Sequence, residues 1–214
     1  MSDANPIPKA QSPLAEAWTM FRRNRAAMFG LVLLACIIAM TLTGPFLYRV
    51  DPLDIISAPL LPPGDDGMLL GTDYLGRDLL AGIINGGRAS LAVGLSAALL
   101  TMAVGVTMGA LAGFYGGWID RILMRVTEFF QVLPPLILAM TIVLLFTPSL
   151  GSVAISIGLV SWPTPARLTR AEFMRIRELD YVRAARAMGA RDGRIIWRLI
   201  LPNAAPPLIV SGTL

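Results

Sequence analysis

The chain has 214 residues, of which 55% are hydrophobic and only 15% are charged, whereas soluble domains average about 25% charged residues. It contains no histidine and a single cysteine, Cys36, which excludes a disulfide framework, Cys- or His-ligated zinc and Ser-His-Asp or Cys-His catalysis. The only lysine, Lys9, lies in a Pro-rich N-terminal tail, so no Gly-rich loop ends in the lysine that a P-loop needs. We therefore expect a membrane protein that does not hydrolyse ATP itself, with no catalytic residue, no cofactor and no bound metal.

Three long uncharged runs follow the N-terminal segment, at 26–48, 89–119 and 129–166. A helix needs about 20 apolar residues to cross a bilayer, so the first two runs predict one span each. The third is too long for one span, and a Pro-Ser-Leu-Gly break at 148–151 divides it. The sequence thus predicts an all-α, polytopic transmembrane helix bundle with spans at about 29–48, 89–115, 129–147 and 150–166.

The distribution of arginine predicts how these spans are oriented. The connection 49–88 has three arginines and six aspartates, whereas the segment 167–198 has nine arginines and four acidic residues. Cytoplasmic connections are enriched in Lys and Arg, so we expect the N-terminal segment 1–28, the short connection 120–128 and the arginine-rich segment to be cytoplasmic. The net charge of +4 then reflects topology, and we expect no binding to nucleic acid.

Two features of the predicted spans bear on mechanism. No charged residue lies within them, which disfavours a proton-driven carrier, although backbone carbonyls leave a sodium-coupled carrier open. Gly105, Gly109, Gly113 and Gly117 recur every fourth residue and form one stripe on a helix, which favours close helix packing over a substrate path. We also expect the proline pair 134–135 to kink the start of the third span.

The connection expected to lie outside contains a polar octet at residues 71–78. Its candidate residues are Gly71, Thr72, Asp73, Gly76, Arg77 and Asp78. Glycines permit tight turns and the charged side chains can cap helix ends, so the physical chemistry favours a structured surface turn. A metal site built from the two carboxylates is poorly specified, because hard cations need more oxygen ligands.

The arginine-rich segment 167–203 is the most informative part of the chain. Residues 180–188 are good helix formers, and Gly189 can adopt the positive φ that ends a helix. An apolar face at 195–200 predicts a second helix that lasts until Pro202. The short helix suits insertion into a groove of another protein, but an amphipathic segment on anionic lipid explains the pattern equally well.

A resemblance favours the first alternative. The residues Tyr181 to Gly189, followed by Leu-Ile-Leu-Pro-Asn at 199–203, resemble the EAA loop of ABC-transporter permease subunits. That pattern is Glu-Ala-Ala, three residues, Gly, nine residues and Ile-x-Leu-Pro. The corresponding residues here are Arg183, Ala184, Ala185, Gly189, Leu199, Leu201 and Pro202. Arg183 replaces the glutamate and reverses its charge, while Leu199 replaces the isoleucine conservatively.

The outer octet and the Phe-Arg-Arg-Asn-Arg-Ala-Ala segment at 21–27 are similar to the C-type permeases of dipeptide, oligopeptide and nickel importers. This resemblance implies a permease domain over 29–214, with an EAA loop at about 167–203 that couples to ATPases. It also implies six spans, so we expect the chain to be truncated in a fifth span that begins at residue 204. The resemblance also implies that the protein is located in a bacterial plasma membrane, with its N-terminus in the cytoplasm.

The partners that the resemblance implies are a second homologous permease, two cytoplasmic ATPases, an extracytoplasmic binding protein and membrane lipid. Two other classes of function stay open at this point, a secondary carrier driven by an ion gradient and a membrane scaffold. The resemblance is compatible with a peptide, a nickel chelate or another small solute as the substrate.

Overall fold

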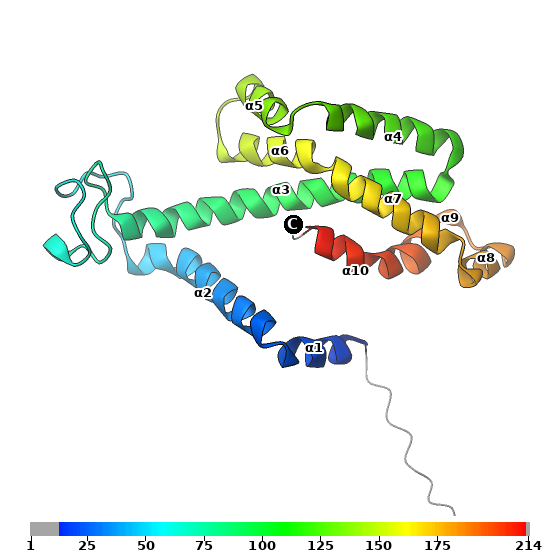
Figure 1. Cartoon of the computed structure of the whole chain (residues 1–214), viewed down its shortest axis with the longest axis horizontal. Helices are drawn as coiled ribbons and strands as arrows, with labels where there is room; N and C mark the ends of the chain where they lie inside the picture. Colours follow the sequence, from blue (N-terminus) through cyan, green and yellow to red (C-terminus); the bar gives the residue numbers. More distant parts are fainter. Residues whose placement is uncertain (1–12, 213–214) are drawn as a thin grey trace, which may run out of the picture. The chain divides into compact units, whose positions relative to one another are not determined.

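The computed structural model describes residues 13–212, and Lys9 lies outside the described residues. Every regular element in this part of the chain is helical, with only two isolated β-bridges besides, so the all-α prediction is confirmed. The elements are α1 (Pro13–Arg23), α2 (Arg25–Leu47), the 3-10 turn η1 (Asp65–Gly67), α3 (Leu79–Tyr115), α4 (Gly117–Val132), α5 (Pro135–Leu145), α6 (Leu150–Ser161), α7 (Pro163–Arg177), α8 (Asp180–Ala187), α9 (Asp192–Arg194), the π-helical turn η2 (Ile195–Ile200) and α10 (Leu201–Gly212). Figure 1 labels the α-helices among them.

The chain divides into two compact units, Met1–Arg88 and Ala89–Leu214. In the first unit, the end of α2 packs closely on the first turns of α3. A Cβ atom added to Gly44 would lie 2.7 Å from Cγ2 of Ile84, and Thr41 is fully buried nearby. Close approach at glycine allows two apolar helices to pack without large side chains between them.

Among residues 13–212, three helical stretches are long and apolar enough to cross a membrane: Arg25–Leu47, Leu79–Tyr115 and Asp192–Gly212. The first covers residues 29–47 of the span expected at 29–48. The second begins ten residues before the expected start at 89, because Asp78 accepts a hydrogen bond from the amide of Ala81 (2.9 Å) and so starts the helix early. Arg88 therefore lies inside α3 and not in the connection before it.

The third expected span is not one helix. It consists of α4 and α5, which meet at an angle of 91°. Pro135 has no amide hydrogen, and it disfavours helical backbone at Pro134 before it, so the expected kink is a full break. The connection expected at 120–128 is accordingly part of α4. The fourth expected span likewise consists of two helices, since α6 ends at Ser161 and α7 begins at Pro163.

The last helical stretch corrects a further expectation. The helix at 195–200 does not end at Pro202 but continues into α10, so the apolar run from residue 204 belongs to a helical stretch that begins at Asp192. The amide of Leu201 donates to the carbonyl of Ile196, five residues back. This widened turn relieves the clash that a proline ring makes with the preceding helical turn.

The second unit is organised around α7, which packs against α4, α6, α8, η2 and α10, and Figure 1 shows it running between α4 and α10. A Cβ atom at Gly105 would lie 2.7 Å from Cγ of Pro165, and one at Gly113 would lie 2.7 Å from Cβ of Phe173. The glycine stripe is therefore a packing surface for α7, as the sequence favoured. Gly117 is not part of it, because it begins α4 and a Cβ atom added there would meet no atom within 4 Å.

Candidate functional site

Helix α8 lies on the main hydrophobic core of the second unit. Its buried residue, Val182, is 1% exposed and belongs to the same core cluster as Ile176 of α7 and Ile195 of η2. Ala185 is half-buried, and the other residues of the short helix are exposed. Ala184 and the other candidate residues on that side are exposed. The helix is therefore anchored to the core by Val182, and its exposed residues include two small ones, Ala184 and Ala187.

The C-terminus of α8 is a complete Schellman motif. Gly189 adopts φ of +81°, the amide of Ala190 donates to the carbonyl of Ala185 (3.0 Å), and the amide of Gly189 donates to the carbonyl of Arg186 (3.0 Å). These two bonds satisfy carbonyls that the end of a helix leaves unpaired. The positive φ expected at Gly189 is therefore observed, and it fixes the direction in which the chain leaves α8.

Arg183 has a partner in this chain. Its guanidinium donates to the carboxylate of Glu178 (2.6 Å), and the Nε of Arg177 donates to the same carboxylate (3.2 Å). The hydrogen bond from Arg183 lowers the pKa of Glu178 below its ordinary value, and the hydrogen bond from Arg177 lowers it further by a smaller amount. Both charged groups of the Arg183 pair are exposed, so the pair orients α8 more than it stabilises it.

The Leu-x-Leu-Pro motif at residues 199–202 lies outside α8, and its two leucines are less exposed than most residues of that helix. Leu199 and Leu201 are partly buried and pack against the core cluster, whereas Pro202 is exposed at the start of α10. The structure therefore separates the predicted set into two groups. Arg183, Ala184 and Gly189 are exposed and Ala185 is half-buried. The two leucines pack against the core cluster to which Val182 of α8 belongs.

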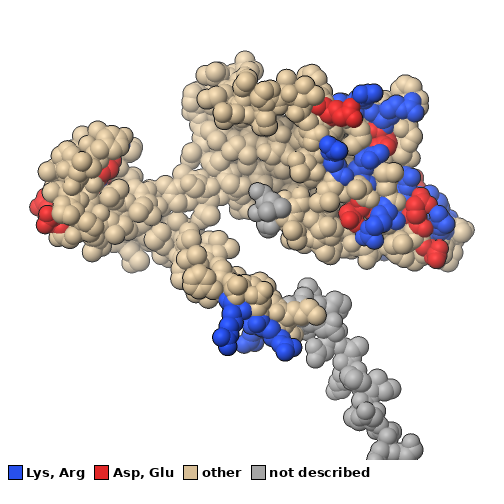
Figure 2. Space-filling model, in the orientation of Figure 1, with Lys and Arg blue, Asp and Glu red and all other residues tan. Residues whose placement is uncertain are grey.

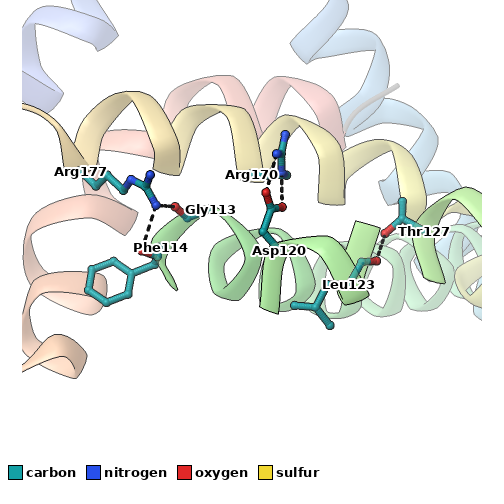
Figure 3. A network of polar contacts seen from close by, with 7 residues as sticks. All are labelled: Gly113, Phe114, Asp120, Leu123, Thr127, Arg170 and Arg177. Atoms are coloured by element: carbon teal, nitrogen blue, oxygen red, sulfur yellow. Dashed lines mark hydrogen bonds and ion pairs between the residues drawn. The ribbon is translucent and has the colours of Figure 1, made fainter. Parts of the chain in front are cut away.

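Polar contacts join this segment to the neighbouring helices, and sequence reasoning missed them. Arg177, at the end of α7, donates to the carbonyls of Gly113 (2.8 Å) and Phe114 (3.2 Å). These carbonyls belong to the last turn of α3, where no later amide of the helix is available to donate a hydrogen bond to them. Arg170 of α7 makes a bidentate pair with Asp120 of α4, as Figure 3 shows.

The outer octet folds as a turn, as its composition favoured. Asp73 accepts hydrogen bonds from the amides of Leu75 (2.8 Å) and Arg77 (2.9 Å). The backbone hydrogen bond from Arg77 is the main cause that lowers the pKa of Asp73. Thr72 donates to the carbonyl of Ala58 (2.7 Å) and accepts from the amide of Leu61 (2.9 Å). The turn is thereby tied to the chain that precedes it.

Asp78 is the most deeply buried polar residue of the octet, at 1% exposure. It caps α3 through Ala81 and also accepts a hydrogen bond from the hydroxyl of Tyr48, and this bond raises the pKa of Tyr48. Sequence reasoning missed Tyr48, because no local pattern links residues thirty positions apart. Among the described residues no group of three acidic, His or Cys side chains could hold a metal ion. The octet is thus a structural turn that connects the end of α2 to the start of α3.

Gly76 offers a matched test of this turn. It has φ of +79°, and a Cβ there would overlap the carbonyl oxygen of Ser57 and lie 3.3 Å from Cγ2 of Ile55. Gly64 also has positive φ, but a Cβ there would meet no atom within 4 Å. We expect Gly76→Ala to loosen the connection and expose it to limited proteolysis, whereas Gly64→Ala bears only a backbone cost of about 1 kcal/mol. Equal cleavage rates in the two variants would contradict the assignment of the octet as a tightly packed turn.

Residues 105–214, which contain the glycine stripe, α7 and α8, match the family model described as binding-protein-dependent transport system inner membrane component. Residues 12–63 match the N-terminal transmembrane domain of oligopeptide transport permease C. The chain belongs to the binding-protein-dependent transport permeases. It is therefore a multi-pass membrane permease subunit and not an enzyme.

Curated relatives within this permease family are similar over nearly the whole chain. The dipeptide transport system permease protein DppC of Haemophilus influenzae is 37% identical over 220 residues, covering 100% of this chain and 75% of the relative. The di/tripeptide transport system permease protein DppC of Pseudomonas aeruginosa is 40% identical over 209 residues (95% and 69%). DppC of Bacillus subtilis is 37% identical over 203 residues (93% and 62%).

Proposed function

We propose that this permease forms half of the pathway of an ABC importer for dipeptides and other small peptides. It pairs with a second homologous permease, receives substrate from an extracytoplasmic binding protein, and is driven by two cytoplasmic ATPases that bind α8. The observation that carries the proposal is the exposed position of Ala184 and Ala187 on α8, a helix that Val182 anchors to the core and whose sequence aligns with the EAA pattern. The assignment of small peptides as the substrate is based on the names of the relatives, which are dipeptide and di/tripeptide permeases.

The contacts of α7 suggest how motion at α8 reaches the membrane helices. Glu178 lies between α7 and α8 and binds arginines of both. Arg177 and Arg170 then join α7 to α3 and α4. Since a bidentate arginine pair and close glycine packing resist deformation, α7 moves together with the parts of α3 and α4 that it contacts. A displacement of α8 by the ATPases is thereby passed to the helices that line the pathway.

Reconstitution tests this function. The chain, its partner permease, the two ATPases and the binding protein are assembled in proteoliposomes with a labelled dipeptide outside. We expect uptake that requires both ATP and the binding protein. Uptake driven by an ion gradient without ATP would support a secondary carrier instead, and absence of any substrate-dependent response would support a scaffold.

We also propose that the N-terminus and α8 face the cytoplasm and that the 48–78 connection faces outside, on the basis of the arginine counts. In a Cys36→Ser background, a membrane-impermeant maleimide should label Asp65→Cys in intact cells. Arg191→Cys, next to α8, should react only after the membrane is permeabilised. The reverse pattern would overturn the orientation.

A further inference from the structure

Helix α1 exposes three large apolar side chains among its described residues. Trp18 is 53% exposed, Met20 73% and Phe21 36%. The rings of Trp18 and Phe21 stack with their centroids 5.8 Å apart and their planes 12° apart. Residues three apart lie on the same side of a helix, so these two rings form one aromatic surface. Exposure of such a surface to water is unfavourable, which indicates that something apolar covers it.

The connection to α2 places this surface close to a bilayer. Only Asn24 separates α1 from α2, and its side chain caps α2 by accepting from the amides of Ala26 (3.1 Å) and Ala27 (3.2 Å). Helix α2 has 23 residues and is a candidate span, which gives it a length of about 35 Å. The apolar core of a bilayer is about 30 Å thick, so the junction lies at the level of the lipid headgroups and α1 is adjacent to it.

The charges at this junction match an anionic surface. Arg22 and Arg23 end α1, and Arg25 begins α2. All three are exposed, and among the described residues none of them makes an ion pair. Figure 2 shows these basic side chains gathered on one side of the junction. Positions 21 and 23 are two residues apart, which places Phe21 and Arg23 on opposite sides of the helix.

We propose that α1 is an interfacial helix that binds the surface of an anionic phospholipid bilayer. Trp18 and Phe21 enter the boundary between headgroups and acyl chains, where aromatic rings are favoured. Arg22, Arg23 and Arg25 contact the lipid phosphates. A helix with an aromatic side, a basic side and a span directly after it has the features of a segment that lies in the plane of the membrane. The inference is independent of the transported substrate and of the ATPases.

Spin labels on opposite sides of α1 test the proposal in the complete chain. Single cysteines are introduced as Phe21→Cys and Arg23→Cys in a Cys36→Ser background, and the labelled protein is placed in nanodiscs of phosphatidylcholine and phosphatidylglycerol. The label at position 21 should collide with oxygen, which concentrates in the bilayer, several-fold more than with a water-soluble nickel chelate. The label at position 23 should show the opposite preference. A label introduced as Phe29→Cys in α2, where Phe29 is 71% exposed, gives the reference for a lipid-facing position.

Two outcomes would overturn the proposal. Free access of the nickel chelate to both positions would show that α1 projects into water. Exclusion of both reagents from position 21 would show that protein, and not lipid, covers the aromatic surface.

A second comparison tests the role of charge. In nanodiscs of phosphatidylcholine alone, the depth of the label at position 21 should decrease relative to the mixed lipid. The triple variant Arg22→Gln/Arg23→Gln/Arg25→Gln should remove this dependence on lipid composition. An insertion depth that is the same in neutral and anionic lipid would overturn the assignment of the arginines to the headgroups.

Discussion

Ala184→Trp is expected to abolish ATP-dependent uptake while the permease remains folded and inserted. Ala184 is exposed on α8, so a larger side chain there does not disturb the core that Val182 joins. It does enlarge the side that we propose fits the groove of an ATPase. Overpacking of a close-fitting site costs about 1–3 kcal/mol, which corresponds to a loss of about 5-fold to 150-fold in affinity.

Copurification of the ATPases with the permease at matched expression measures this effect directly. Ala184→Ser, which adds one small polar atom, is the control and should still bind the ATPases. A helix that lay on lipid would tolerate or favour an added tryptophan. Normal capture and normal uptake in Ala184→Trp would therefore exclude α8 as the contact with the ATPases. Ala184 is a better position than Ala185, because Ala185 is half-buried and a large residue there would also strain the core.

Gly189 gives an independent test of the same contact. Its φ is +81°, and a Cβ atom there would meet no other atom within 4 Å, so the cost of Gly189→Val is confined to the backbone, at about 1–2 kcal/mol. The strain would redirect the end of α8, and we expect weaker capture of the ATPases. Asparagine tolerates the same backbone conformation, so Gly189→Asn should behave nearly as the wild type.

The sequence predicted those parts of the fold that depend on local signals. A run of uncharged residues is enough to identify α2, and helix formers followed by glycine are enough to identify α8. The early start of α3 could not be predicted, since it depends on Asp78, whose burial also involves Tyr48 from the end of α2. The angle between α4 and α5 was also beyond prediction, because the proline pair marks a break but tertiary packing sets its size.

The local geometry of the candidate site was predictable to the same extent, whereas its role in binding ATPases stays a prediction. The family pattern located Ala184, Ala185 and Gly189, and the end of α8 has the expected geometry. The partner of Arg183 could not be read from the pattern, which has a glutamate at that position. Nor could the pair of Arg170 and Asp120, since the two residues are fifty positions apart and charge alone does not specify which groups meet.

Substitution of a glycine in the stripe on α3 is expected to cause the largest loss of stability. At Gly109, an added Cβ would overlap the carbonyl oxygen of Ala166 and lie 2.6 Å from Cβ of Thr169. Both atoms belong to the buried side of α7, where Ala166 and Thr169 are fully buried. Gly109→Ala should therefore separate α3 from α7, with a cost of about 1–3 kcal/mol or more, and lower the apparent unfolding temperature in detergent by several degrees.

Gly94→Ala is the matched control, since Gly94 lies on the same helix and a Cβ there would meet no atom within 4 Å. Alanine is also favoured over glycine in a helix interior by about 1 kcal/mol, so this variant should be as stable as the wild type or more stable. Trimming a neighbouring side chain cannot rescue Gly109→Ala, because the obstructing atom at Ala166 is a backbone oxygen that every residue carries. Equal unfolding temperatures for Gly109→Ala and Gly94→Ala would contradict close packing of α7 on the stripe, and with it the physical connection from α8 to α3.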